Sequence, residues 1–324
     1  MPQKKRKRLP WWGLAILDLL LTGLLLCIFA LFHHVLPQMR LKAQGGIAPI
    51  ASPAVTQKAD EEYNEESRSI RERFAAKFSE EIIVSENGYK SPDISVAVTE
   101  HSFPDASPAL TYYVADIYVA QVENFQTCFS EGSAAAPEKI AKENAAVLAM
   151  NGDYCLNQRS GLLVRNGLVY MTEQTSCDLC VLYRDGTMAT YSPEEYKAEE
   201  ILEKEPYQTW KFGPALLEKD GSPKTEFNTG SALLNAHPRS GIGYFEPGHY
   251  CFVVVDGRQG GYSDGLDMAA FAELFAKLGC VSAYNLDGGA SSVMVLGGET
   301  VNAPCNGGRY VSDMLIIKEL EALK

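Results

Sequence analysis

The stretch from residue 251 to residue 294 constrains the fold most, because it holds two strand-like runs with one helical segment between them. Residues 252–255 are apolar and mostly β-branched, which favours a short buried strand. Residues 267–278 carry apolar side chains at helical spacing, with an acid at the start as N-cap and Gly279 as a C-terminal stop. A second apolar run covers residues 281–286. The order strand, helix, strand predicts a right-handed β-α-β unit whose two strands are parallel.

Polar residues lie at the ends of both predicted strands. Asp256 and Arg258 follow the first strand, and Asn285 and Asp287 close the second. The carboxyl ends of parallel strands lie at one edge of a sheet, where open α/β sheets bind their ligands. Side chains alternate along a strand, so the two members of each pair share a face. We therefore expect two acids, an amide and a guanidinium to converge on one crevice.

A glycine-rich turn follows Asp287. Gly288 and Gly289 permit positive φ angles and a close approach of a ligand to the main chain. Ser291 and Ser292 add hydroxyl groups, and successive N–H groups in such a turn can bind a phosphate or a developing oxyanion. An Asp-Gly-Gly sequence on its own favours a simple tight turn between strands over a binding site.

The same arrangement of polar residue, glycine and acid recurs at residues 151–153, directly after the apolar run 147–150. This recurrence favours one shared site over several unrelated turns. The segments and their order resemble the phosphodiester glycosidase domain family, over roughly residue 94 to the C-terminus. The matching segments are residues 151–154 (Asn-Gly-Asp-Tyr), 212–214 (Phe-Gly-Pro), 237–243 (His-Pro-Arg-Ser-Gly-Ile-Gly), 256–259 (Asp-Gly-Arg-Gln), 285–292 (Asn-Leu-Asp-Gly-Gly-Ala-Ser-Ser) and 302–304 (Asn-Ala-Pro), with Arg309.

The resemblance implies hydrolysis of a sugar 1-phosphodiester, of the α-N-acetylglucosaminyl type, at the anomeric carbon of a cell-surface or exopolysaccharide glycan. Two departures from the family pattern are Ala290, where a third glycine is usual, and Ser240, where threonine is usual. Carboxylates and an imidazole suit the catalytic steps, guanidinium groups and a glycine-rich turn suit phosphate, and amides suit sugar hydroxyls. The residues implied are Asp287, Asp153, Asp256 and His237 for catalysis; Arg239, Arg258, Gly288, Gly289, Ser291 and Ser292 for phosphate; and Asn151, Asn285 and Gln259 for sugar.

Other chemistries fit the same residue types. The implied hydrolysis requires no cofactor, but Asp153, Asp256 and Asp287 are hard oxygen ligands that Ca²⁺ or Mg²⁺ accepts. A metal-dependent phosphodiesterase that breaks the P–O bond is therefore a second candidate. A membrane-tethered module that binds glycans without turnover is a third. The sequence does not set the separation of the carboxylates, so retention and inversion at the anomeric carbon both stay open.

The N-terminus predicts membrane attachment. Residues 1–8 are basic, and residues 9–36 form an apolar segment long enough to cross a bilayer, interrupted by Asp18 and a histidine pair. We expect an uncleaved single-pass anchor with its N-terminus in the cytoplasm and the catalytic domain outside. A cleaved signal peptide is the alternative. The net charge of −12 argues against a nucleic-acid partner, because binding to phosphate backbones normally needs a basic surface.

Residues 37–90 are predicted to be a spacer followed by a charged juxtamembrane helix within residues 60–81. Residues 91–324 would form the catalytic domain, an α+β or mixed α/β fold with a mixed β-sheet core and flanking helices. Oligomeric state is open. Strands are expected at residues 94–99 and 110–121, a helix at 137–142, an exposed helical connector at 196–204, and hairpins that turn at 166–167 and 185–186.

Of the eight cysteines, Cys27 lies in the predicted span and seven lie outside it, an odd number that cannot pair completely within one chain. Two pairs of them carry specific expectations. Cys177 and Cys180 have the spacing of a redox dithiol or half a zinc site, but no second metal-ligand pair accompanies them, so a local disulfide is expected. Cys251 and Cys280 begin the two strands of the central unit and are expected to be small buried apolar residues.

Overall fold

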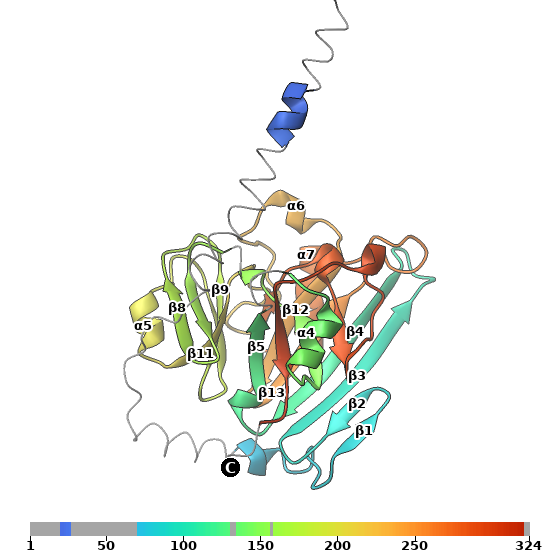
Figure 1. Ribbon diagram of the computed structural model, residues 1–324. Coiled ribbons are helices and arrows are strands. Elements are labelled where there is room, and N and C mark those ends of the chain that lie inside the picture. The colour runs from blue at the N-terminus through green and yellow to red at the C-terminus, as the bar shows by residue number, and fades with distance from the viewer. Residues whose placement is uncertain (1–19, 27–69, 130–133, 156–157, 321–324) are drawn as a thin grey trace, which may run out of the picture. The chain divides into compact units, whose positions relative to one another are not determined.

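Figure 1 shows a computed structural model of the protein, which describes residues 20–26, 70–129, 134–155 and 158–320. The chain divides into two units, residues 1–48 and 49–324. In the first unit the described residues 20–26 are helical. No helix within the described ranges is both long and apolar enough to cross a bilayer. Most of the predicted span at 9–36 lies outside the described residues, so the anchor stays a prediction.

The larger unit contains a seven-stranded sheet in the order β1-β2-β3-β4-β13-β12-β14, and every neighbouring pair is antiparallel. Alternating β-branched and aromatic residues in β3 and β4 match the strands predicted there. The strands are β1 (Ile83–Ser85), β2 (Gly88–Lys90), β3 (Ile94–Phe103), β4 (Leu110–Val119), β12 (Arg239–Glu246), β13 (His249–Val255) and β14 (Ser282–Asn285).

A second sheet has five strands in the order β16-β15-β6-β17-β5, and its pairings are also antiparallel. It gathers chain segments that are far apart in sequence, because β6 lies between β15 and β17. This places the end of β6, at Asn151, close to the turn that precedes β15. The strands are β5 (Phe125–Phe129), β6 (Leu148–Asn151), β15 (Met294–Leu296), β16 (Glu299–Thr300) and β17 (Asp313–Ile317).

The two sheets pack face to face, and one helix covers the outer face of each. The central core joins Phe252 from the seven-stranded sheet with Phe125 and Leu315 from the five-stranded sheet. On the outer face of the first sheet, α7 (Met268–Leu278) packs through Phe275, and on the outer face of the second, α4 (Pro137–Glu143) packs through Ile140. Each fully buried aromatic or aliphatic side chain stabilises this arrangement by roughly 1.5–3 kcal/mol. The fold is therefore sheet-rich α+β with few helices.

Residues 162–210 form a smaller sheet and a hairpin with their own apolar cluster. The hairpin β7-β8 turns at Asn166 and Gly167, both with positive φ, and β9-β10 turns at Asp185 and Gly186, as predicted. The elements of this region are β7 (Leu162–Arg165), β8 (Leu168–Thr172), β9 (Leu179–Tyr183), β10 (Met188–Tyr191), α5 (Ala198–Leu202) and β11 (Pro206–Trp210), followed by α6 (Ser231–Leu234).

The predicted strand-helix-strand unit is present with one difference. Helix α7 begins at the N-cap Asp267, which accepts a 2.8 Å hydrogen bond from Ala270 N, and ends at Gly279 with φ 87°. Strands β13 and β14 are parallel, but β12 lies between them and is antiparallel to both. Because β12 starts where its two neighbours end, Arg239 joins the sheet edge that carries Asn285.

The structure changes three further predictions, two about the region before the domain and one about a cysteine pair. The seven-stranded sheet starts with β1 inside the interval predicted as spacer, so residues 83–90 belong to the sheet. The described part of the juxtamembrane helix ends at residue 73, where the chain turns toward β1 and leaves Ile82 64% exposed. Cys177 and Cys180 are both free thiols, because Cys180 points into the core from β9 whereas Cys177 precedes the strand. Cys251 and Cys280 are buried, as predicted, with their sulfur atoms 3.7 Å apart.

Candidate active site

The turn that follows β14 is the centre of the candidate site. The side chain of Asp287 is 14% exposed, and its Oδ2 accepts a 2.7 Å hydrogen bond from Arg309 Nη2. Its Oδ1 accepts a 2.9 Å hydrogen bond from Gly288 N. The backbone of Asp287 is tied to the end of β6, since Asn151 Nδ2 donates to its carbonyl oxygen at 2.7 Å. The two Asn-and-Asp segments that the sequence singles out are therefore neighbours.

Arg258 covers the next residues of this turn. It is exposed, has φ 59°, and takes part in none of the ion pairs among the described residues. A Cβ atom on Gly289 would lie only 3.1 Å from Arg258 Nη1, so glycine lets the guanidinium approach the main chain. Arg309 Nε also donates to Ser291 Oγ. Two guanidinium groups, one of them already paired with Asp287, thus lie over one short turn.

His237 holds the Arg258 side chain in place. Its Nε2 lies 2.8 Å from the carbonyl oxygen of Ala232, so this nitrogen carries the proton and donates. Its Nδ1 is then an acceptor, and Arg258 Nη2 lies 3.2 Å from it. The imidazole therefore orients a guanidinium.

Arg239 occupies a different environment from Arg258. It is buried, and it donates from Nε to Leu266 O at 3.0 Å and from Nη2 to Leu233 O and Asn235 O at 2.6 Å each. Burial lowers the pKa of Arg239 to about 10. Its donors anchor the segment around α6 to the sheet edge, so the phosphate role expected for Arg239 conflicts with its contacts.

Asp256 is also buried, and both of its carboxylate oxygens accept hydrogen bonds. Its Oδ1 accepts from Asn302 Nδ2 at 2.7 Å, and its Oδ2 accepts from Ala303 N and Tyr262 Oη at 2.9 Å each. Burial raises the pKa of Asp256 above its ordinary value. Gln259 Nε2 donates to Ala303 O at 2.7 Å. Asp256 and Gln259 therefore fasten the loop at residues 302–303.

Asp153 turns away from Asp287 into the protein. Its Oδ1 accepts from Arg165 Nη2 at 2.6 Å, and its Oδ2 accepts from Lys211 N at 2.7 Å. Burial alone would raise the pKa of Asp153, but the charge of Arg165 and these hydrogen bonds hold it below the ordinary value. The side chains of Asp153 and Arg165 are fully buried, so this ion pair sits beneath the turn.

Asp313 completes this buried cluster, and the sequence predictions missed it. Its Oδ2 accepts from Asp153 N at 2.9 Å, and its Oδ1 accepts from Cys155 N at 3.1 Å. Burial, and then the negative charge of Asp153, raise the pKa of Asp313 to about 7. A lone acid at the start of an apolar strand carries no local sequence signal, so only the pairing of β17 with β6 reveals its place.

The predicted metal ligands do not form one ligand set. Asp153, Asp256 and Asp287 each accept hydrogen bonds from a different group of donors. Among the described residues, the acids that cluster within 4.8 Å of one another are Asp153 and Asp313, together with the thiol of Cys155. Ca²⁺ and Mg²⁺ prefer oxygen ligands, and Arg165 already neutralises Asp153. The residues of this cluster therefore do not fit either ion.

The remaining predicted ligands mostly hold the turn together. Asn151 Oδ1 accepts from Ser240 Oγ at 2.7 Å and from Val293 N at 3.1 Å, and Asn285 Nδ2 donates to Gly213 O at 2.7 Å. Most backbone N–H groups of the turn, which were expected to bind an anion, instead donate hydrogen bonds to other groups of the protein. The backbone N–H groups that donate to acceptors within the protein are those of Asp287, Gly288, Gly289, Ser291 and Ser292.

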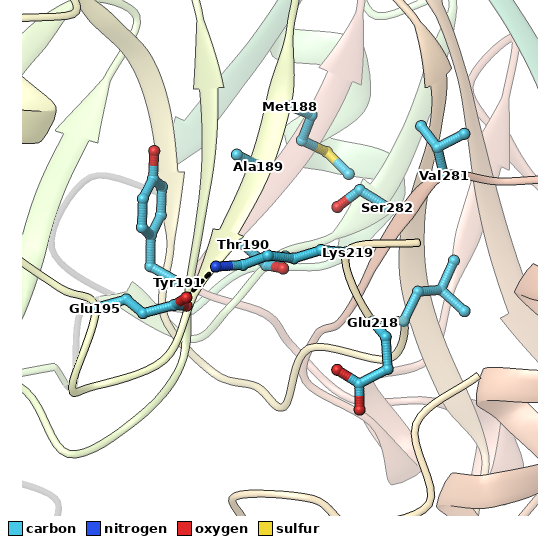
Figure 2. Close-up of a pocket in the computed structure, with 10 residues that line it drawn as sticks. Met188, Ala189, Thr190, Tyr191, Glu195, Glu218, Lys219, Val281 and Ser282 are labelled. Carbon is cyan, nitrogen blue, oxygen red and sulfur yellow. Dashed lines mark hydrogen bonds and ion pairs between the residues drawn. The ribbon is translucent and has the colours of Figure 1, made fainter. Parts of the chain in front are cut away.

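A cavity lies at the other end of β14, away from the turn at Asp287. Its volume is about 340 Å³, and its lining combines β10 with Lys219 and with Ser282 at the start of β14 (Figure 2). Lys219 reaches across this cavity to an ion pair with Glu195 (Figure 2). None of the predicted site residues lines it. Because Ser282 and Asn285 are at opposite ends of the strand, this cavity is separate from the turn at Asp287.

Three comparisons place these observations among known proteins. The sequence profile of the phosphodiester glycosidase family matches residues 144–318. The SPbeta prophage-derived uncharacterized protein YomE of Bacillus subtilis is 34% identical over 186 residues, which are 55% of this chain and 29% of YomE. The chain therefore spans less than a third of the length of that relative.

Two solved structures share the fold. The catalytic domain of zebrafish N-acetylglucosamine-1-phosphodiester alpha-N-acetylglucosaminidase, auto-inhibited by its pro-peptide, superposes with a TM-score of 0.58 at 20% identity, over 78% of this chain and 93% of that one. A hypothetical protein from Synechocystis superposes with a TM-score of 0.51 at 14% identity, over 70% of this chain and 62% of that one.

Proposed function

This chain belongs to the phosphodiester glycosidase family, and on that premise we propose that it hydrolyses a sugar 1-phosphodiester at the anomeric carbon. The observation that carries the proposal is the partly exposed carboxylate of Asp287 at a turn covered by Arg258 and Arg309. An ester of phosphate with a sugar presents the two features that this arrangement recognises. One is an anion, and the other is an anomeric carbon that becomes positively charged as its bond breaks.

Arg258 and Arg309 are the proposed phosphate ligands. Both are exposed, and a guanidinium group donates two parallel, charge-assisted hydrogen bonds to phosphate oxygens. In the proposed complex Arg309 exchanges its bond with Asp287 for one with the phosphate, which frees the carboxylate for the reaction. His237 keeps Arg258 oriented through its Nδ1. Arg239 takes the structural role that its carbonyl partners indicate.

Asp287 is the proposed nucleophile or base at the anomeric carbon. The bond between that carbon and the phosphate oxygen breaks, and its electron pair stays on the phosphate. Phosphate is a good leaving group, so the reaction needs little help from a general acid. Oxygen from water ends on the sugar, and the products are a free sugar and a phosphomonoester. Asp153 and Asp256 support the turn and the adjoining loop from their buried positions.

The proposed substrate class is a glycan phosphate at the cell surface or in an exopolysaccharide. The zebrafish structure is named for N-acetylglucosamine 1-phosphodiester, and we propose the same sugar for the first assays. We also propose that residues 9–36 anchor the chain in the membrane with the domain outside. The net charge of −12 repels anionic polymers in general, so binding has to depend on the local positive field of the two arginines.

Hydrolysis in water labelled with ¹⁸O tests the reaction. The substrate is the 4-nitrophenyl phosphodiester of α-N-acetylglucosamine 1-phosphate, and the enzyme is the full-length chain. We expect the label in the sugar, no turnover by Asp287→Asn, and full turnover by the control Asp220→Asn in an exposed turn. Label in the phosphate would indicate a phosphodiesterase instead. Sugar binding without any turnover by the unaltered chain would indicate a glycan-binding module.

A further inference from the structure

Two exposed tyrosines stand beside Asp287. Tyr154 is 43% exposed and Tyr310 is 68% exposed, whereas every other tyrosine that the structure describes is buried or half-buried. Both tyrosines line the same narrow pocket as Asp287 and Arg309. With Arg309 paired to Asp287, the volume of this pocket is about 10 Å³, which is room for one water molecule. The two tyrosines with exposed rings are therefore both next to the candidate catalytic carboxylate.

The backbone at Tyr154 adds a second, independent observation. Tyr154 has φ 59°, a left-handed conformation that favours glycine or asparagine and costs a residue of this kind roughly 1–3 kcal/mol. Residues on both sides of it are clamped by one buried acid, because Asp153 N donates to Asp313 Oδ2 and Cys155 N donates to Asp313 Oδ1. The chain thus holds a large aromatic side chain in solvent at a position where the backbone favours glycine or asparagine.

We propose that Tyr154 and Tyr310 form an aromatic platform for the sugar ring of the substrate, and that Asp313 is the positioning residue that fixes Tyr154. A pyranose has an apolar face of C–H groups, which an exposed aromatic ring covers while the phenol hydroxyl bonds to sugar oxygens. The proposal rests on the proposed function for the position of the scissile bond. The platform places the sugar next to Asp287, where Arg258 and Arg309 then hold the phosphate.

Binding of the two product halves tests the platform without requiring turnover. Titrations of the full-length chain with N-acetylglucosamine and with 4-nitrophenyl phosphate, followed by calorimetry or ligand-observed NMR, give separate affinities for the sugar and phosphate sides. We expect Tyr154→Gly and Tyr310→Ala each to weaken sugar binding by about tenfold and to leave phosphate binding unchanged. Tyr154→Phe and Tyr310→Phe are expected to keep most of the affinity.

Thermal unfolding separates this role from a structural one. Tyr154→Gly removes the left-handed strain, so it is expected to unfold at the same or a higher temperature while it loses sugar affinity. Glu205→Gly is the matched control, because Glu205 is exposed, has φ 53° and belongs to a turn after α5; it is expected to change stability in the same direction and binding not at all.

Each outcome decides the proposal. Sugar binding that is indifferent to both tyrosine variants, or absent from the unaltered chain across a panel of hexoses and N-acetylhexosamines, overturns the platform. Loss of 4-nitrophenyl phosphate binding in Tyr154→Gly, with sugar binding intact, assigns the rings to the other half of the substrate and also overturns it. Tyrosine-dependent sugar binding in a chain that hydrolyses nothing would support the platform and contradict the proposed reaction.

Discussion

Arg258 and Arg239 stand at the same sheet edge and differ in what their guanidinium groups touch. Arg258 is exposed over Gly289, whereas Arg239 is buried against three carbonyl oxygens. An arginine that already satisfies backbone acceptors cannot turn to a substrate without leaving those acceptors unpaired, which costs roughly 1–3 kcal/mol for each one. At the scale of the residue, burial therefore separates an arginine held by backbone carbonyls from one that is free to bind a ligand.

Substitution of each arginine by glutamine is expected to affect different measurements. Arg258→Gln removes a charge-assisted contact to phosphate, so it should raise KM by about tenfold to a hundredfold with little change in the melting temperature. Arg239→Gln should lower the free energy of unfolding by about 2–4 kcal/mol, with a smaller effect on KM in the folded fraction. Steady-state kinetics and thermal unfolding of both variants check this, and a reversed pattern would restore Arg239 as the phosphate ligand.

Asp313 makes stability depend on pH. Its pKa in the folded protein is about 7, above the ordinary 3.8, so between about pH 4 and pH 7 the folded chain keeps a proton that the unfolded chain has released. The stability from this group is fully present below about pH 4 and is lost as pH rises through about 7. The raised pKa values of Asp256 and Glu123 act in the same direction.

We therefore expect the melting temperature to fall between pH 5 and pH 8. Asp313→Asn cannot titrate, so it should unfold at a lower temperature at pH 5 but show a shallower decline toward pH 8. Thermal unfolding at four pH values in one ionic strength measures both slopes. A melting temperature that climbs across this window would contradict the protonated state assigned to Asp313.

At the scale of the element, β12 is adapted to lie under α7. A Cβ atom on Gly243 would come within 2.6 Å of Cys280 Sγ, 2.7 Å of Cys251 Sγ and 2.9 Å of Phe275 Cδ1. The absence of a side chain therefore lets the strand pass beneath the helix and between the two buried thiols. In this packing the start of β12 pairs with the ends of β13 and β14, at the sheet edge that carries the candidate site.

Gly243→Ala is expected to destabilise the protein by about 1–3 kcal/mol, because the added methyl group meets atoms that are packed on all sides. Gly260→Ala is the matched control, since a Cβ atom there would have nothing within 4 Å and the backbone is not left-handed. Denaturant or thermal unfolding measures the difference. Equal stability of the two variants would mean that α7 can shift away from the sheet.

Elements whose signals are local could be predicted from the sequence. The caps of α7 and the Asn166-Gly167 turn lie within a few residues of the structure that they determine. The insertion of β12 between β13 and β14 could not be predicted, because pairing is set by contacts between distant segments. The same reason applies to the acids: Asp153 was expected at the sheet edge, but its direction depends on Arg165 and on Lys211 N.

At the scale of the whole molecule, charge is divided sharply along the chain. Residues 1–8 are basic, residues 9–36 are apolar, and the chain as a whole carries a net charge of −12. The acidic remainder does not interact favourably with anionic lipid headgroups, so the proposed membrane attachment depends on the basic and apolar segments at residues 1–36. Because the glycans proposed as substrates lie outside the cell, the anchor and the catalytic proposal make a consistent pair.

The anchor is expected to hold the full-length chain in the membrane fraction through extraction with high salt and with alkaline carbonate. Leu20→Arg together with Leu24→Arg should release it, because each arginine near the middle of a span raises the free energy of insertion by about 2.5–3.5 kcal/mol. Leu234→Arg, at an exposed position in α6, is the control and should stay in the membrane. Fractionation and the intact mass measure the result. A shortened chain in the medium would show that the segment is a cleaved signal peptide, and release by salt alone would show that it only rests on the surface.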